Sequence, residues 1–271
     1  MSESLGPADI RELSYVDFMA FLDETNRPPG GKTAVRELIH RANVRAQDLV
    51  LDVGCNTGFV SFELSRVAEC SVVGVDVSET MVQRATARLG RGHAREGIPV
   101  SFMRGDATDL PFATGRFDRV VCGGSTPFVS DPLAALREYR RVVRDWGFVA
   151  ELNFYYDSSP PASLLTELAE RLGTEIEPWT LDDWLTRYDE AGFERYDVMT
   201  EPVEQVTRAD IDEYVDRMVE RNAYDTDVEA AIRTRLVELM DLFNRNHEHL
   251  QYGVFVLRKR PVPEQVSLFD A

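Results

Sequence analysis

Cysteine is scarce in the 271-residue chain, and its scarcity excludes several kinds of protein. Cys55, Cys70 and Cys122 are too few for a disulfide framework, and no Cys-x-x-Cys pair offers a zinc site, so we interpret them as reduced thiols. No apolar run approaches 18 residues, which predicts no membrane-spanning helix. The start, MSESLGPADIREL, carries acids where a signal peptide needs basic and then apolar residues, which predicts a cytoplasmic protein.

Lysine is even scarcer than cysteine: Lys32 and Lys259 are the only two, and every other cationic side chain is an arginine. Against 30 lysines and arginines stand 47 acids, so the formal net charge is −17. Such a surface repels phosphate backbones, which argues against a nucleic-acid-binding protein. The 44% of hydrophobic and 28% of charged residues are typical of a folded globular chain.

Strands and helices are expected to alternate through the first 155 residues. β-Branched runs predict strands at 48–53, 71–75, 99–103, 117–122 and 147–154. Helical spacing of apolar residues fills most of the gaps, with helices expected at 58–68, 78–89 and 131–143. This alternation is typical of an α/β protein with a doubly wound parallel sheet. Ligands of such sheets bind beyond the carboxyl ends of the strands, so functional residues are expected directly after each strand.

The pattern changes in the C-terminal half of the chain. Two helices are expected at 160–173 and 180–192, with strands at 193–200 and 252–258. The segment between these strands is helical and acidic, with 13 acids and 6 arginines in residues 201–250. We therefore expect four parts: an N-terminal helical cap segment (1–46), a core (47–200 and 251–260), an acidic helical insertion (201–250) and a tail (261–271).

The most informative segment is VLDVGCNTGFVSFELS, residues 50–65. A strand ends near Asp52, and Gly54 and Gly58 flank a tight turn before a helix. Glycines let a ligand approach the backbone there, and the helix start offers free N–H groups. The dinucleotide fingerprint needs a glycine where Asn56 stands, so a different nucleoside site is favoured. A glycine-bearing turn without a ligand is the alternative.

Further polar groups and bare backbone follow the next three strands. Asp76 ends the second strand, where a carboxylate can accept both hydroxyls of a ribose; its alternative role is a helix cap, which Ser78 suits better. Asp106 follows the third strand, where it could accept a proton from an adenine amino group. Cys122 and Gly123 follow the fourth and bring bare backbone to the same edge.

These four segments, in this order and spacing, resemble the class I S-adenosylmethionine-dependent methyltransferases over residues 33–155 and the last strand. The resemblance implies a Rossmann-like seven-stranded sheet of order 3-2-1-4-5-7-6 with an antiparallel last strand, S-adenosyl-L-methionine as cofactor, and methyl transfer. By position it assigns Asp52, Gly54, Cys55 and Gly58 to the methionine part, Asp76 to the ribose, Asp106 and Ala107 to the adenine, and Cys122 and Gly123 to the methyl-bearing side. Asn56, which replaces a common glycine, and Val77 complete the cofactor-binding candidates.

Two segments are expected to define the methyl acceptor. Tyr15 and Phe18 belong to an amphipathic helix, and Arg27, Gly30 and Gly31 to the joint after it, so this segment could fold over the cofactor as a lid. A packing helix with a surface turn is an equal alternative. The insertion at 201–250 connects the last two strands at the edge where the cofactor is expected, so it should lie over the active site. Its acids favour a neutral or amine acceptor. A solvated acidic face is the alternative.

No catalytic residue is assigned. The methyl group of the cofactor is already activated, so the protein need only align the acceptor and exclude water. His247, His249 and Tyr155 are the candidates for a general base. The two histidines are two residues apart on a helix and lack a third ligand, so no metal is predicted.

We expect a small-molecule substrate, with the acceptor atom N, O or C left open, and neither a nucleic-acid nor a membrane partner. The absence of an Asn-Pro-Pro-Tyr type of motif after the fourth strand adds to the argument against DNA. A methyltransferase-like protein without catalysis, a methyltransferase acting on a protein, and a homodimer are left open. The tail segment QVSLF (265–269) is similar to peptides that bind DNA sliding clamps, although local packing is the simpler interpretation.

Overall fold

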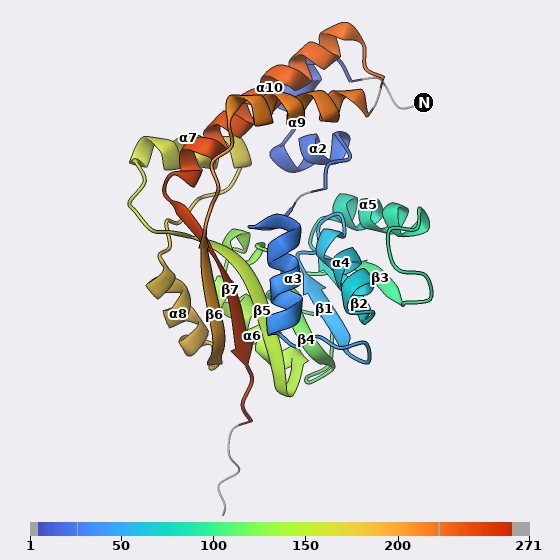
Figure 1. Cartoon of the computed structure of the whole chain (residues 1–271), viewed down its shortest axis with the longest axis vertical. Helices are drawn as coiled ribbons and strands as arrows, with labels where there is room; N and C mark the ends of the chain where they lie inside the picture. Colours follow the sequence, from blue (N-terminus) through green and yellow to red (C-terminus); the bar gives the residue numbers. More distant parts are fainter. Residues whose placement is uncertain (1–4, 26, 222, 262–271) are drawn as a thin grey trace, which may run out of the picture.

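A computed structural model describes residues 5–25, 27–221 and 223–261 of the chain. Within these residues, one sheet has the strand order β3-β2-β1-β4-β5-β7-β6 (Figure 1). The strands are β1 Leu49–Val53, β2 Ser71–Asp76, β3 Val100–Arg104, β4 Phe117–Cys122, β5 Val143–Tyr156, β6 Glu194–Pro202 and β7 Leu250–Arg258. Strand β7 runs antiparallel to β5 and β6, whereas the pairs among β1 to β5 are parallel. The predicted fold and strand order are confirmed.

Helices cover both faces of the sheet, as an α/β sheet with two buried faces requires. One face packs against α3 (Gly31–Arg41) and α4 (Phe59–Val67), and the other against α6 (Pro132–Val142) and α8 (Leu181–Glu190). Helix α5 (Glu79–Gly90) lies along β2 and β3, and a short 3-10 helix, η1 (Thr126–Phe128), follows β4. The N-terminus of α6 is capped by the Asp131 carboxylate, which accepts from Ala134 N at 2.9 Å.

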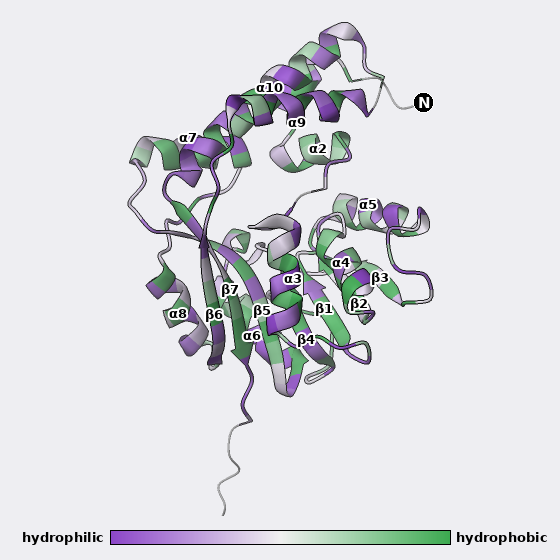
Figure 2. Cartoon of the chain, in the orientation of Figure 1, coloured by the Kyte–Doolittle hydropathy of each residue, from purple (hydrophilic) through white to green (hydrophobic). Residues whose placement is uncertain are grey.

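A second body of helices lies beyond the upper end of the sheet in Figure 1. It consists of α1 (Pro7–Glu12), α2 (Tyr15–Phe21), α9 (Arg208–Glu220) and α10 (Thr226–His247), and we call it the helical cap. Its core is separate from those of the sheet and includes Phe18, Ile211 and Leu236. In Figure 2 the central strand β1 is mainly hydrophobic, whereas α10 carries both hydrophilic and hydrophobic residues, as a helix with one solvated face does.

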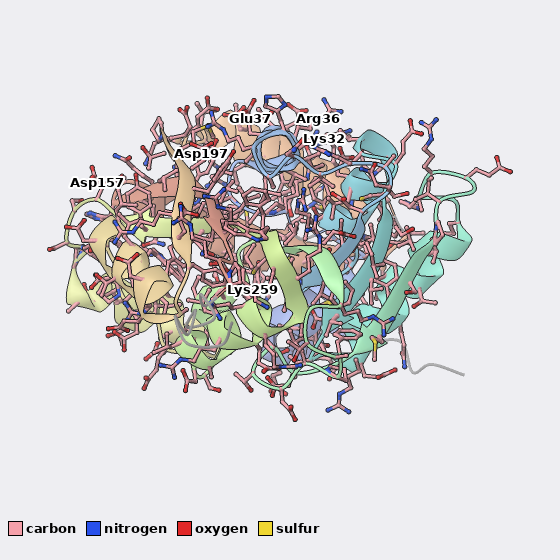
Figure 3. All side chains as sticks on the ribbon, turned by 90° about the horizontal axis from the view of Figure 1, so that it is seen from below. Lys32, Arg36, Glu37, Asp157, Asp197 and Lys259 are labelled. Atoms are coloured by element: carbon pink, nitrogen blue, oxygen red, sulfur yellow. The ribbon has the colours of Figure 1, made fainter. Side chains whose placement is uncertain are left out.

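Helix α3 belongs with the sheet although it precedes β1 in the chain. Its apolar residues Ala34, Val35 and Leu38 pack in the same core as β1 and β5. Ion pairs hold its ends: Lys32 Nζ lies 3.4 Å from Glu63 Oε1, and Arg41 Nη1 lies 2.7 Å from Asp197 Oδ2. Figure 3 shows Lys32, Arg36 and Glu37 along this helix and Asp197 on β6. The division of the chain into four parts stays a prediction.

Helix α7 (Ala162–Leu172) follows β5, and its Leu164 and Leu168 share a small apolar cluster with Leu242 of α10. It therefore connects the sheet to the helical cap.

No helix within the described residues has both the length and the apolar character needed to cross a bilayer. The QVSLF segment lies outside the described residues.

Candidate functional site

The turn between β1 and α4 has an unusual backbone. Gly54, Asn56 and Gly58 have φ values of 67°, 48° and 90°, all in the left-handed region. Asparagine tolerates this region better than most side chains, which explains how Asn56 replaces a glycine here. Cys55 N donates to Val75 O at 3.0 Å, and Gly58 N donates to Cys55 O at 2.9 Å. The turn is therefore held by backbone hydrogen bonds, one of which comes from the neighbouring strand β2.

Different neighbours leave no room for a side chain at the two glycines of this turn. A Cβ at Gly54 would lie 1.9 Å from Ser125 Oγ, and Ser125 Oγ itself donates to Val53 O at 3.1 Å. A Cβ at Gly58 would lie 2.7 Å from Phe62 and 3.0 Å from Phe102. The restriction at Gly58 thus comes from two packed aromatic rings, and that at Gly54 from the turn after β4.

Asp76, at the end of β2, is fastened to the turn after β1. Its Oδ2 accepts from Asn56 N at 2.8 Å and its Oδ1 from Ser78 N at 2.9 Å. Burial raises the pKa of this half-buried carboxyl, and the two N–H donors oppose that rise. Each oxygen keeps a second lone pair for a ligand. The Ser78 hydroxyl caps α5 by accepting from Met81 N, so the alternative role of Asp76 as helix cap falls away.

The neighbouring residues Val77 and Asp106 are open to solvent. Val77 is 63% exposed directly after Asp76, an unusual place for a large apolar side chain. Asp106 Oδ1 accepts from both the backbone N and the hydroxyl of Thr108 at 2.8 Å, and these bonds lower its pKa. Ala107 is partly buried against the sheet core, and Gly105 N donates to Asp76 O at 3.0 Å. The ends of β2 and β3 are thereby brought together.

Cys122 and Gly123 present different groups to this edge. The Cys122 thiol is buried, 3.1 Å from Ser125 Oγ and 3.2 Å from Thr126 Oγ1, and burial raises its pKa. A Cβ at Gly123 would lie 2.8 Å from Val60 Cγ2 and 3.5 Å from Pro28 Cβ. The joint before α3 therefore lies directly over the carboxyl end of β4, and only backbone is available there.

Asp52 lies beneath the turn rather than at its surface. The residue is 0% exposed, its Oδ2 accepts from Ser61 Oγ at 2.6 Å, and its Oδ1 has no hydrogen-bond partner among the described residues. Burial raises its pKa to about 7. The carboxyl group therefore joins the end of β1 to the first turn of α4.

The lid candidates divide into two groups. Phe18 is 0% exposed in the cap core, and the Tyr15 ring meets Phe243 edge-on at 6.0 Å, with burial raising its pKa to about 12. Arg27 is exposed at the joint. Gly30 caps α3 with φ 65°, where a Cβ would lie 2.5 Å from the Tyr252 ring, whereas Gly31, with φ 57°, faces open space. The lid itself stays a prediction.

The three candidate general bases have different surroundings. His247 ends α10, and its imidazole lies 6.2 Å from the Phe154 ring near the carboxyl end of β5. Its Nδ1 is buried without a hydrogen-bond partner among the described residues, and burial lowers its pKa. His249 Nδ1 lies 2.9 Å from Ser158 Oγ, and Tyr155 OH donates to Gln251 Oε1 at 2.7 Å. His247 thus differs from the other two in having a buried nitrogen without a hydrogen-bond partner among the described residues.

No group of three or more His, Cys, Asp or Glu side chains in the described part of the chain could hold a metal ion.

The sequence analysis missed a buried polar cluster behind Cys122. Thr126 Oγ1 donates to Glu151 Oε1, and Asn153 Nδ2 donates to Glu151 Oε2 at 3.4 Å and to Tyr188 OH at 3.1 Å. Burial raises the Glu151 pKa to about 7. The signal was present: Glu151 and Asn153 interrupt an otherwise apolar run at 147–154 of β5.

Known proteins similar to this chain carry related domains. Residues 51–150 match the family described as Methyltransferase domain. An uncharacterized protein of Haemophilus influenzae is 28% identical over 186 residues, covering 68% of this chain and 73% of that protein. Demethylmenaquinone methyltransferase of Staphylococcus saprophyticus is 30% identical over 131 residues, covering 48% and 54%. The chain thus spans about half the length of this second relative.

Solved structures share the fold. The MccD protein superimposes with a TM-score of 0.74 at 24% identity, covering 87% of this chain and 100% of that one. Phosphoethanolamine N-methyltransferase 2 of Haemonchus contortus, in complex with S-adenosyl-L-methionine, gives a TM-score of 0.69 at 15% identity, covering 94% and 57%. At these identities the likeness concerns the fold.

Proposed function

Because the chain belongs to the class I S-adenosylmethionine-dependent methyltransferases, whose cofactor is S-adenosyl-L-methionine, we propose that it methylates a small molecule held between the sheet edge and the helical cap. One observation carries the proposal. The left-handed turn after β1, the Asp76 carboxylate and the bare backbone at Gly123 meet at the carboxyl ends of three adjacent strands. The joint at Pro28 covers the same edge.

The residues of this edge fit the cofactor by their chemistry. Asp76, with lone pairs left on both oxygens, would accept the ribose hydroxyls, and the exposed Val77 beside it would cover an apolar ring face. Asp106 and Ala107 would receive the adenine. The turn from Gly54 to Gly58 and the backbone at Gly123 would hold the methionine part. When bound, the cofactor supplies a methyl group on a cationic sulfonium, and the surrounding carboxylates and carbonyls favour that charge.

His247 is the residue that we propose as general base. An oxygen or nitrogen acceptor loses a proton when it gains a methyl group, and the imidazole of His247, which lies against Phe154 of β5, can take it. The lowered pKa keeps the imidazole neutral at pH 7, as a base requires. The acidic insertion favours an acceptor that is neutral or an amine. A protein substrate and cofactor binding without catalysis are the alternatives.

Calorimetry with S-adenosylmethionine and its demethylated product, followed by a product-release assay over a panel of neutral and amine metabolites, tests this proposal. We expect binding of both nucleosides and release of the demethylated product with at least one acceptor. Binding without turnover on any acceptor would favour the non-catalytic alternative. Radiolabel recovered only in precipitated protein would favour a protein substrate.

The base is tested by His247→Gln, with His249→Gln as the matched control. For a nitrogen or oxygen acceptor, we expect His247→Gln to lower kcat about 100-fold or more while leaving cofactor affinity unchanged. The wild-type rate should rise with pH through a value below 6.5, and His247→Gln should lose that rise. An equal loss in His249→Gln would remove His247 from this role.

A further inference from the structure

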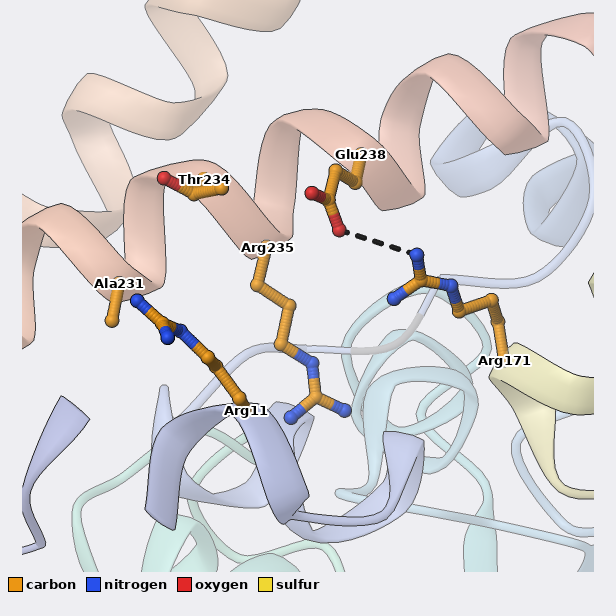
Figure 4. Close-up of a pocket in the computed structure, with 6 residues that line it drawn as sticks. All are labelled: Arg11, Arg171, Ala231, Thr234, Arg235 and Glu238. Carbon is orange, nitrogen blue, oxygen red and sulfur yellow. Dashed lines mark ion pairs between the residues drawn. The ribbon is translucent and has the colours of Figure 1, made fainter. Parts of the chain in front are cut away.

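Three arginines, two from the helical cap and one from α7, line a cavity that the methyl-transfer proposal does not use. Arg11 comes from α1, Arg171 from α7 and Arg235 from α10 (Figure 4). The cavity has a volume of about 150 Å³ and is completed by Ala231, Thr234 and Glu238. In a chain with a net charge of −17, a cavity bounded by three cations and one carboxylate is unusual.

Most of this positive charge is uncompensated. Arg171 Nη2 lies 3.4 Å from Glu238 Oε2, which accounts for the single carboxylate. Arg235 donates to two neutral carbonyl groups, Ile10 O and Leu13 O, and its guanidinium lies 4.2 Å from the Phe18 ring centroid. Arg11 makes no side-chain hydrogen bond or ion pair within the residues that the structure describes.

Arg235 keeps N–H donors that its contacts with α1 do not use, and it lines the cavity together with Arg11 and Arg171. Arg235 uses two of its five N–H groups on the carbonyls at the end of α1, so three remain. Burial, followed by the charge of Arg171, lowers the pKa of Arg235, as expected where like charges stand close together. Planar guanidinium groups match the oxygen geometry of phosphate.

We propose that this cavity binds a phosphate group, as inorganic phosphate or as a phosphomonoester. The ligand would receive N–H donors from α1, α7 and α10, and would thereby fasten the N-terminal helix to the two others. This site is separate from the proposed methyl-transfer site and does not rest on it. The phosphate would bind outside the methyl-transfer site. The methyl acceptor, which we expect to be neutral or an amine, is a different molecule.

The experiment measures phosphate binding by calorimetry and by thermal shift, at constant ionic strength with chloride as the replaced ion. The variants are Arg11→Gln and Arg11→Gln/Arg171→Gln, because Arg235 also holds the end of α1. Arg137→Gln is the control: Arg137 is exposed on α6 and has no side-chain partner among the described residues. We expect saturable 1:1 binding that falls about tenfold in Arg11→Gln, falls further in the double variant and is unchanged in the control.

Glycerol 3-phosphate, titrated beside inorganic phosphate, distinguishes the two sources of the group. Tighter binding of the ester would identify a phosphomonoester as the ligand, and equal binding would identify the phosphate group alone. Absence of saturable binding by the wild type, or equal binding by the wild type and the double variant, would overturn the proposal. Adding the demethylated cofactor should leave the phosphate titration unchanged, because the two sites are separate.

Discussion

The turn after β1 and the helical cap lie at the same edge of the sheet but are held by different forces. In the turn, backbone groups and one carboxylate make the contacts, with Asn56 N bound to Asp76 and Cys55 N bound to Val75 O. In the cap, apolar side chains from distant parts of the chain form one core, which includes Phe18 and Leu236. The turn therefore depends on backbone conformation, and the cap depends on side-chain volume.

The largest effect that separates these two regions is expected from Phe18→Ala. Phe18 is fully buried, so its truncation should lower the free energy of unfolding by about 3–5 kcal/mol, measured by urea denaturation. Val16→Ala on the same helix is the control, because Val16 is 42% exposed and should cost far less. Cofactor affinity should change less than tenfold in Phe18→Ala, because the turn has its own hydrogen bonds. A complete loss of cofactor binding in a folded variant would contradict the separation.

Asp76→Ala, in contrast to Phe18→Ala, should act mainly on cofactor affinity. Removing the carboxylate leaves the ribose hydroxyls unpaired, which should cost about 1.5–3 kcal/mol, or roughly 10–100-fold in the dissociation constant measured by calorimetry. Asp109→Ala is the control, since Asp109 is exposed in the neighbouring loop. Unchanged affinity in a folded Asp76→Ala protein would remove Asp76 from the site.

The pH dependence of stability tests the interior of the turn. Asp52 has a folded-state pKa of about 7, above its ordinary value of 3.8, so the folded state binds a proton more tightly than the unfolded state. This contribution is fully present below pH 4 and is lost as the pH rises towards 7. Asp52→Asn should gain about 2 kcal/mol relative to the wild type between pH 5 and pH 7, measured by urea unfolding at both values. A constant difference between the two proteins would show that Asp52 is ionised throughout.

The smallest effect is expected at the joint between the two regions. If the segment ending at Gly30 and Gly31 closes over the cofactor, exchange of the Arg27, Gly30 and Gly31 amide hydrogens should slow on adding the cofactor. Exchange within α8, on the far face of the sheet, serves as the reference. Equal exchange at the joint with and without cofactor would exclude the lid and leave the sheet edge assignment intact.

The sequence predicted the sheet edge better than the cap, for a physical reason. Gly54 directly follows β1 and Asp76 ends β2, so local spacing reveals them. The predicted strand order is confirmed, and residues 51–150 match the family described as Methyltransferase domain. The cap core joins Phe18 to Leu236 across more than 200 residues, which no local pattern encodes. Gly58 stays a cofactor candidate, and the structure adds that a Cβ there would meet Phe62 and Phe102. The contact with Phe102 comes from β3, outside the 50–65 motif, so local spacing does not reveal it.

The buried cluster around Glu151 and the arginine cavity were missed for the same reason. Their members come from separate strands and helices, so local spacing does not show that they meet, although Glu151 and Asn153 are conspicuous as polar residues in an apolar strand. His247 and His249 are close in sequence, which makes them look like a pair. The structure separates them, with His247 against Phe154 and His249 against Ser158.

The most direct test of the account is a crystal structure of the protein in complex with the demethylated cofactor. We predict the ribose hydroxyls on the Asp76 carboxylate, the adenine beside Val77 and Asp106, and the sulfur facing the space between Gly123 and His247. Density for the nucleoside anywhere else, or a ribose without contact to Asp76, would contradict the central claim that the edge formed by β2, β1 and β4 is the methyl-transfer site.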